Sequence, residues 1–314
     1  MIPIAARYNL PTKSPVTLVM KIFVENKKSS IADRLMLWPS VGLLLVWMIV
    51  PLAITLYFSV RRYSLMRSGQ TRFNGLENYW YLLRDPGFLH AVVNTLLILA
   101  GVLASTIIFG TLFAWLYDYE FPGKRVARLL VIAPFFVMPT VNALLWKDLM
   151  MHPIYGFLAA LARAVGINPI DWFGRVPLTS IIILLSWQWL PFAFLIFLTA
   201  MQSLNREQLE AASLDGAGPW QTFWYQILPH LRRPIGAVIM IEAIFLLSVF
   251  AEIFATTGGG PGTATTNLTY LVYSLGLLQF DVGLASAGGI VAVIFANIIA
   301  VFLMRSVSRN LRAA

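Results

Sequence analysis

The sequence contains no cysteine and very little charge. The absence of cysteine excludes disulfide bonds, thiolate nucleophiles and cysteine-ligated metal sites. Only 12% of the residues are Asp, Glu, Lys or Arg, whereas 59% are hydrophobic, which is more apolar surface than a soluble domain needs to fill its core. The composition therefore predicts an integral membrane protein.

The sequence also lacks the residue clusters that catalytic sites require. Its three histidines, His90, His152 and His230, lie in different loops, so no pair has the spacing of metal ligands. Its one Gly-Lys pair, Gly123-Lys124, lacks the upstream glycine of a phosphate-binding loop. We therefore predict no catalytic residue, no metal site and no ATP hydrolysis by this chain.

Basic residues outnumber acidic ones, with 23 Lys and Arg against 14 Asp and Glu and a net charge of +9. In a soluble protein this excess would favour nucleic-acid binding. Here the charges lie between apolar runs, so membrane topology explains them better, and we predict no nucleic-acid partner.

Six apolar runs predict six transmembrane helices, because a bilayer core needs about 20 residues per helix. We therefore expect an all-α integral membrane fold, with one membrane domain over residues 35–304. The predicted spans are residues 35–60, 91–117, 129–146, 176–205, 235–254 and 282–304. Two further apolar stretches, within 147–175 and at 268–280, are too interrupted or too short to span and are predicted as interfacial or re-entrant segments.

The distribution of Lys and Arg predicts the orientation of the spans. Six spans put both termini on one side, together with the turn at 118–128 and the polar loop at 201–234. These segments carry more Lys and Arg than the segments on the other side, which predicts cytoplasmic tails at 1–34 and 305–314. The arginine-rich segment at 61–90 opposes this bias. The first tail contains no apolar run that resembles a cleavable signal.

The polar loop at 201–234 predicts a helix-turn-helix between two spans. Asn205 is a good N-cap for a first helix, Gly216 can end it in the left-handed conformation, and Pro219 suits the first turn of a second helix that ends before Pro229. The first helix carries a face of small residues, Ala211, Ala212 and Ser213, between the charges of Glu210 and Asp215. Another protein's backbone could approach such a face closely.

This loop resembles the cytoplasmic coupling loop, or EAA motif, of ABC-importer permeases. The matching residues are Glu210, Ala211, Ala212, Asp215, Gly216, Leu228 and Pro229. The resemblance implies that the first helix docks in a cleft of a separate ATPase subunit, with Glu210 paired to a basic residue there. One position departs from the family: Gln226 stands where an apolar residue is usual, and Ile227 follows it, so we expect the second helix to be rotated or packed differently.

Other segments extend the resemblance over most of the chain after residue 34. Residues 75–79 (Gly-Leu-Glu-Asn-Tyr), 94–96 (Asn-Thr-Leu) and the outer turn Gly259-Gly260-Pro261 resemble the first permease of carbohydrate importers, and residues 131–140, 187–192 and 268–273 resemble mannitol and sorbitol permeases. The resemblance implies a bacterial inner-membrane machine. Its parts would be this chain, a homologous second permease, two ATPase subunits that bind ATP and Mg²⁺, and an extracytoplasmic binding protein, with no cofactor on this chain.

Sugars and polyols are held by polar side chains and aromatic faces in a largely apolar pore. The candidates within the predicted spans are Asn142, Trp187, Gln188, Ser248, Glu252 and Asn297. Each also has a packing interpretation, since intramembrane polar side chains commonly bond neighbouring helices and tryptophans commonly face lipid. Glu252 is either a hydroxyl acceptor near the outer turn or a snorkelling acid, and Glu242 is predicted to be structural, bonded to the second permease.

The residues leave several functions open. Mannitol or sorbitol import is favoured by resemblance, with maltose, trehalose or glycerol phosphate as alternatives in the same machine. An anionic phosphate should require a cation in the pore, where Lys147 is the one candidate. A secondary carrier or channel would not need the Glu210 helix, and a membrane-embedded enzyme would need a catalytic cluster that the sequence lacks.

Overall fold

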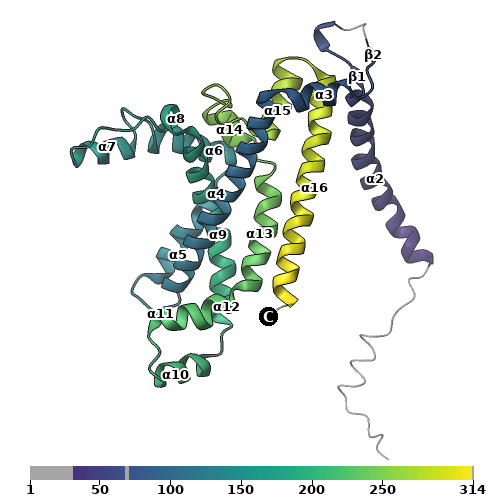
Figure 1. Ribbon diagram of the computed structural model, residues 1–314. Helices are drawn as coiled ribbons and strands as arrows, with labels where there is room; N and C mark the ends of the chain where they lie inside the picture. Colours follow the sequence, from purple (N-terminus) through teal and green to yellow (C-terminus); the bar gives the residue numbers. More distant parts are fainter. Residues whose placement is uncertain (1–30, 68–70, 313–314) are drawn as a thin grey trace, which may run out of the picture. The chain divides into compact units, whose positions relative to one another are not determined.

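The computed structural model describes residues 31–67 and 71–312 (Figure 1). The predicted N-terminal tail, residues 1–34, lies almost wholly outside these described residues. The chain divides into two compact units, Met1–Ile54 and Thr55–Ala314, and the second unit contains every site discussed below.

Within the described residues, four helices are long and apolar enough to cross a membrane: α2 (Ile31–Ser59), α4 (Pro86–Leu116), α9 (Pro177–Gln202) and α16 (Val282–Arg312). They correspond to the predicted first, second, fourth and sixth spans. α4 begins five residues before the predicted span, because the Asp85 side chain caps it by accepting from the Gly87 N–H at 2.8 Å. α16 continues to Arg312, so most of the predicted tail at 305–314 is helical.

The third predicted span is sharply bent. α5 (Lys124–Ile132) and the short helix η2 (Ala133–Phe136) form one half, and α6 (Pro139–Leu144) and the π-helix η3 (Leu145–Met150) form the other. The halves meet at 106°, so they form either one broken span or a re-entrant loop. The bend lies just before Pro139, because proline disfavours helical geometry in the residue that precedes it, and Met138 is extended.

The fifth predicted span, residues 235–254, is not one continuous helix. α13 (Arg232–Leu246) ends after 15 residues, and α14 (Ala251–Thr256) begins after a break. Two side chains satisfy the carbonyl groups freed by the break: Thr269 Oγ1 donates to Leu247 O at 3.2 Å and Asn267 Nδ2 donates to Val249 O at 2.6 Å. Non-helical backbone at membrane depth persists only where protein groups satisfy it in this way.

Short elements connect these helices. The predicted interfacial segments form helices. Strands β1 and β2 form a small antiparallel pair, which the all-α prediction missed. These elements are β1 (Arg61–Arg62), η1 (Leu65–Arg67), β2 (Arg72–Phe73), α3 (Glu77–Arg84), α7 (Phe157–Ala164), α8 (Trp172–Arg175), α15 (Leu268–Tyr273) and the π-helix η5 (Ser274–Leu278).

The second unit is held together by close packing of α4 against α9. A Cβ atom on Gly110 would lie 3.0 Å from the Ala193 Cβ and 3.3 Å from the Phe194 backbone nitrogen, so glycine permits this approach. α13 packs against both helices and against α16. Glu242 of α13 has no exposed surface and accepts a 2.7 Å hydrogen bond from Thr106 of α4, so its partner lies inside this chain rather than in a second permease.

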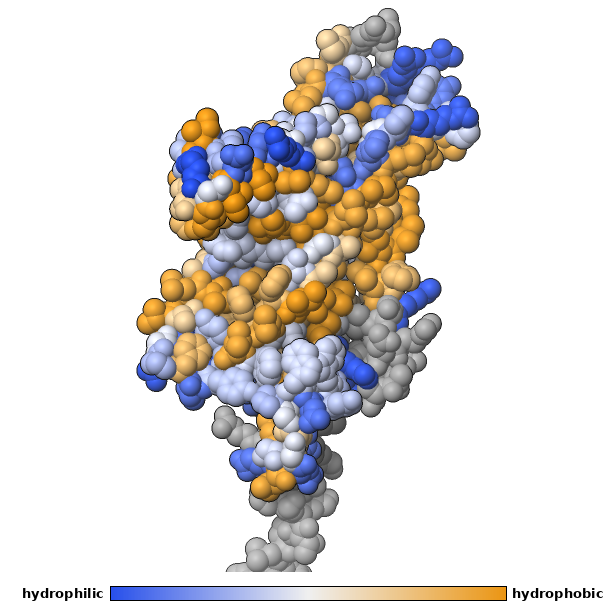
Figure 2. All heavy atoms as spheres, turned by 60° about the vertical axis from the view of Figure 1, so that its left-hand side comes forward, coloured by the Kyte–Doolittle hydropathy of each residue, from blue (hydrophilic) through white to orange (hydrophobic). Residues whose placement is uncertain are grey.

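The outward-facing side chains match a bilayer environment. On the face shown in Figure 2, hydrophobic side chains cover much of the middle, and strongly polar side chains gather toward the two ends. Hydrophobic side chains of three membrane helices are also largely exposed: Ile108 of α4, Phe245 of α13 and Ile298 of α16 expose 62%, 53% and 61% of their surfaces. Such exposure is expected where lipid tails take the place of water.

Candidate functional site

The helix that carries the Glu210-Ala211-Ala212 motif is α10 (Arg206–Leu214), and both of its ends are capped. The Asn205 side chain accepts from the Glu207 N–H at 3.0 Å, which confirms the predicted N-cap. Gly216 has φ +84°, Ala217 N–H donates to Ala212 O and Gly216 N–H donates to Ser213 O. These two bonds form a Schellman motif, so α10 is a short helix with fixed ends.

The surface of α10 is available to a partner. Glu210, Ala211 and Asp215 are exposed, and Ala212 is half-buried. Leu214 exposes 88% of its surface, which is unusual for a leucine in a polar loop. Among the side chains that the structure describes, none forms an ion pair with Glu210. α10 therefore presents a free carboxylate beside small and apolar side chains.

The second helix of the loop continues through Pro229, so the prediction that it ends before this residue is wrong. α11 (Pro219–Thr222), the π-helix η4 (Phe223–Ile227) and α12 (Leu228–His230) follow one another without a break. Pro229 has no N–H to donate, and it is tolerated in this continuous helix because the π turn directly before it is a local adjustment that accommodates a proline. The wide π turn also rotates the helix, so Ile227 is buried.

Aromatic and histidine contacts fasten the second helix to two membrane helices. The Trp115 ring at the end of α4 lies 4.9 Å from the Phe223 ring and 6.3 Å from the Trp220 ring, centroid to centroid. The His230 Nε2 atom lies 3.0 Å from Ala200 O at the end of α9. The sequence analysis missed these contacts, because it considered histidine only as a metal ligand. The run of aromatic residues after Pro219 was the available signal.

The glycine-rich turn forms a tight loop held by threonine side chains. Gly259 has φ +84°, and a Cβ atom there would lie 2.6 Å from Thr266 Oγ1. Thr266 Oγ1 donates to Gly259 O and Thr265 Oγ1 donates to Gly260 O, each at 3.1 Å. The turn that also contains Pro261 is therefore fixed by its own sequence.

The fold joins this turn to a second segment of the resemblance, 169 residues away in sequence. Asn94 Nδ2 of α4 donates to Thr263 O and to Thr266 O, each at 3.0 Å. Thr95 Oγ1 accepts from the Leu268 N–H at 3.0 Å. Figure 1 shows that α10 to α12 and the segment between α14 and α15 lie at opposite ends of α4, α9 and α13.

A third segment of the resemblance anchors the end of α2. Asn78 Nδ2 in α3 donates to Ser59 O and to Arg61 O, each at 2.8 Å, and Tyr79 Oη hydrogen-bonds Ser59 Oγ at 2.7 Å. These bonds satisfy carbonyl groups where the helix ends, so Asn78 and Tyr79 have a structural role.

Two candidate path residues are bonded to each other inside the chain. Asn142 Nδ2 donates to Gln188 Oε1 at 2.8 Å, and Gln188 Nε2 donates to Val137 O at 2.9 Å, next to the bend before Pro139. Asn142 has no exposed surface and Gln188 exposes 7%. In this conformation both side chains are buried, and their hydrogen bonds stabilise the bend.

The other four candidates, Trp187, Ser248, Glu252 and Asn297, form no hydrogen bond with the side chains of this pair among the described residues. Trp187 is half-buried and lines a cavity of about 300 Å³ with Phe113, Tyr117 and Pro134. Ser248 and Asn297 are exposed and bond carbonyl groups of their own helical segments, whereas Glu252 is buried with 6% exposure. No hydrogen bond or ring contact joins these four described side chains. Within residues 31–67 and 71–312, no group of three His, Cys, Asp or Glu could hold a metal ion.

Comparisons with known proteins place the chain among transport proteins. Residues 106–313 match the family described as "Binding-protein-dependent transport system inner membrane component". The chain is 35% identical over 259 residues to a probable ABC transporter permease protein, y4oQ, of Sinorhizobium fredii, covering 82% of this chain and 84% of that protein.

Two further relatives have named substrates. The trehalose/maltose transport system permease protein MalF of Thermococcus litoralis is 30% identical, covering 81% of this chain and 85% of that protein. The sn-glycerol-3-phosphate transport system permease protein UgpA of Yersinia enterocolitica is 29% identical, covering 88% of this chain and 94% of that protein.

The fold is also found in a solved structure. A chain of a bacterial alginate ABC transporter, crystallised with an alginate pentasaccharide-bound periplasmic protein, superposes with a TM-score of 0.71. It is 20% identical, and the match covers 92% of this chain and 94% of that one. At this identity the likeness shows a shared fold.

Proposed function

Because the chain belongs to the family of binding-protein-dependent transport system inner membrane components, we propose that it is the permease subunit of a bacterial importer for a sugar or polyol. Its relatives are ABC transporter permeases, which are transport components rather than enzymes. In the proposed role the chain lines the path of the solute, and a separate subunit supplies the energy of ATP hydrolysis.

The proposed topology has six membrane crossings with both termini in the cytoplasm. Four long helices and the bent pair of α5 with α6 supply five crossings. The broken pair of α13 with α14 supplies the sixth. This orientation puts the Lys- and Arg-rich segments, and α10 with them, on the cytoplasmic side.

In the proposed coupling mechanism, α10 docks in a cleft of an ATPase subunit that binds ATP and Mg²⁺. The observation that supports the proposal is the contact of the helix after α10 with two membrane helices. Phe223 of η4 packs against Trp115 at the end of α4, and His230 of α12 hydrogen-bonds Ala200 O near the end of α9. A displacement of α10 by the closing ATPase is therefore passed to two tightly packed membrane helices. The residues proposed to act here are Glu210, Ala211, Ala212, Asp215, Gly216, Leu228 and Pro229.

The remaining proposed partners are a second homologous permease, a second ATPase subunit and an extracytoplasmic binding protein. The alginate transporter that shares this fold was crystallised with such a periplasmic protein. In this chain a cavity of about 550 Å³ is lined by Arg62, Glu77, Arg84, Asp85 and Asp281. These charged side chains, outside by the proposed topology, offer a docking surface for the binding protein.

Mannitol or sorbitol is the proposed substrate, on the resemblance of residues 131–140, 187–192 and 268–273. Relatives for trehalose and maltose and for glycerol phosphate support these solutes as alternatives. A phosphate would require a cation near the path. The half-buried Lys147 is the candidate, but its Nζ already donates to Ala255 O at 3.3 Å. That bond uses one of the three N–H groups of the ammonium, so glycerol phosphate stays an alternative to a neutral solute.

Uptake by cells that lack this chain tests the proposed function. Deletion is expected to reduce uptake of labelled mannitol or sorbitol to background, and a plasmid copy is expected to restore it. Maltose, trehalose and glycerol 3-phosphate are measured in parallel, so loss of one of these instead reassigns the substrate. Uptake that survives deletion of the partner ATPase would instead indicate a secondary carrier or channel.

A substitution at Glu252 tests its proposed role as a substrate ligand. Glu252→Gln is expected to lower uptake roughly tenfold or more, because a hydrogen bond to a charged group contributes about 1.5–3 kcal/mol. ATPase activity of the substrate-free complex is expected to stay unchanged. Glu242→Gln is the matched control, since Glu242 is an acid on the same broken span with no exposed surface. Equal uptake by the wild type and Glu252→Gln would remove Glu252 from the path.

A further inference from the structure

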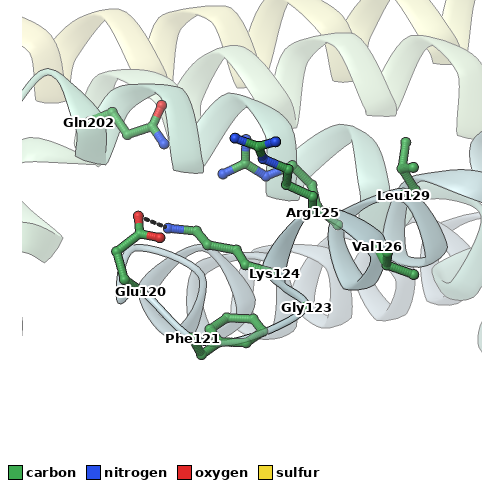
Figure 3. A pocket seen from close by; sticks show the side chains of 9 residues that line it. Glu120, Phe121, Gly123, Lys124, Arg125, Val126, Leu129 and Gln202 are labelled. Carbon is green, nitrogen blue, oxygen red and sulfur yellow. Dashed lines mark hydrogen bonds and ion pairs between the residues drawn. The ribbon is translucent and has the colours of Figure 1, made fainter.

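An open pocket of about 680 Å³ lies between the start of α5 and the end of α9 (Figure 3). Its wall contains Lys124, Arg125 and Arg128 from α5, Glu120 from the preceding turn, and Gln202 from α9. In Figure 3 the Arg125 side chain extends toward Gln202, above the ion pair of Lys124 with Glu120. Because α10 begins four residues after Gln202, the pocket lies at the same end of the second unit as the coupling helix.

The pocket carries positive charge that the described residues do not neutralise. Lys124 Nζ pairs with Glu120 Oε1 at 2.8 Å, which accounts for one of the three cations. Neither Arg125 nor Arg128 forms an ion pair with any side chain that the structure describes. The Nε atom of Arg128 is buried and has no hydrogen-bond partner among those residues. A buried guanidinium nitrogen without an acceptor is unfavourable, so the pocket is complementary to an oxyanion.

The surface beside the pocket is apolar and faces outward. Val126, Leu129 and Leu130 of α5 expose 63%, 68% and 70% of their surfaces. Val126 and Leu129 also line the pocket, so the cations and the apolar ridge are contiguous. A soluble anion would gain nothing from these side chains, whereas a lipid has an anionic head and apolar tails that match both parts.

We propose that this pocket binds the phosphate group of an anionic phospholipid, with the acyl chains along Val126, Leu129 and Leu130. Arg125, Arg128 and the Gln202 amide donate hydrogen bonds to the phosphate oxygens. With the proposed orientation, the lipid belongs to the cytoplasmic leaflet, where basic pockets between membrane helices recognise anionic headgroups. A lipid held here bridges α5 and α9, next to the linkage between α10 and the membrane helices.

Native mass spectrometry of the full-length chain, purified with its partner subunits, tests this site. The sample is delipidated and titrated with phosphatidylglycerol, and phosphatidylcholine is used as a lipid with a phosphate but no net charge. We expect the double variant R125Q/R128Q to weaken phosphatidylglycerol binding roughly 25-fold, since one basic side chain near an anionic lipid contributes about fivefold. Binding of phosphatidylcholine is expected to be weak in the wild type.

The matched control is R232Q/R233Q, which removes two exposed arginines at the start of α13, outside the pocket. This variant is expected to bind phosphatidylglycerol within about twofold of the wild type, because these arginines do not line the site. Equal losses in the two double variants would overturn the proposal, since they would indicate nonspecific charge attraction. If the complex binds inorganic phosphate and does not bind phosphatidylglycerol, the pocket is a site for the free ion, and the lipid proposal is overturned. Size-exclusion chromatography of each variant separates loss of lipid from loss of folding.

Discussion

Glu210→Lys is expected to reduce solute uptake to the background of a deletion strain, while the protein remains inserted in the membrane. Glu210 is exposed on α10, where it presents a carboxylate to the proposed ATPase cleft. Reversal of its charge would place two cations against each other if the cleft supplies a basic partner. Like charges in such an interface disfavour the complex by several kcal/mol, which is enough to abolish coupling.

The local fold is expected to survive this substitution. Glu210 lies in the interior of α10, lysine has a helix propensity similar to that of glutamate, and the caps at Asn205 and Gly216 do not involve the Glu210 side chain. The measurements are uptake of labelled solute, membrane content by immunoblotting and ATPase activity of the purified complex. We expect normal membrane content with loss of both uptake and solute-stimulated ATPase activity.

Glu207→Lys is the matched control for this experiment. It makes the same charge reversal on the same exposed helix, one turn earlier, at a residue outside the Glu210-Ala211-Ala212 motif. We expect uptake to stay within about twofold of the wild type, because only the helix dipole opposes the new charge, by roughly 0.3–1 kcal/mol. Normal uptake in Glu210→Lys would contradict the coupling role of α10. Equal loss in both variants would show a general sensitivity of the loop to charge.

Asn94→Leu is expected to lower the free energy of unfolding by about 2–6 kcal/mol. The Asn94 amide donates to the carbonyl groups of Thr263 and Thr266, and it is 8% exposed. Leucine has a similar size but cannot donate, so two carbonyl groups lose their partner, at about 1–3 kcal/mol each. The turn between α14 and α15 would then detach from α4. The measurement is thermal denaturation of the purified protein in detergent.

Asn297→Leu provides the control, because it removes the same functional group from an exposed position. Asn297 Nδ2 donates to Val293 O within its own helix, and the helix keeps its backbone hydrogen bonds without this side chain. We expect the denaturation midpoint of this variant to stay within 1–2 °C of the wild type, as for a surface substitution of less than about 0.5 kcal/mol. Similar midpoints for Asn94→Leu and Asn297→Leu would show that the turn does not depend on Asn94.

Much of the fold followed from local sequence signals. Long uncharged runs predicted α2, α4, α9 and α16, because burial in lipid requires continuous apolar sequence over the thickness of the bilayer. The caps of α10 were also predictable, since a cap depends on a few adjacent residues such as Asn205 and Gly216.

Contacts between distant segments were not predictable in this way. The break between α13 and α14 depends on hydrogen bonds from Asn267 and Thr269, and the attachment of the Gly259 turn to α4 depends on Asn94. The hydrophobic pattern of residues 235–254 contains no signal for either, because the donors lie elsewhere in the chain. Asn142 and Gln188 were chosen as path residues on polarity alone, and the structure bonds them to each other.

The membrane class, the Glu210-Ala211-Ala212 helix and the resemblance to importer permeases were all predictable, because they depend on composition and on residues close together in the chain. Only contacts in three dimensions show how that helix connects to α4 and α9, which polar side chains are buried, and that Arg125, Arg128 and Gln202 line one pocket. The physical reason is that hydrogen bonds, ring contacts and charge pairing act over a few ångströms in space, whatever the separation along the chain.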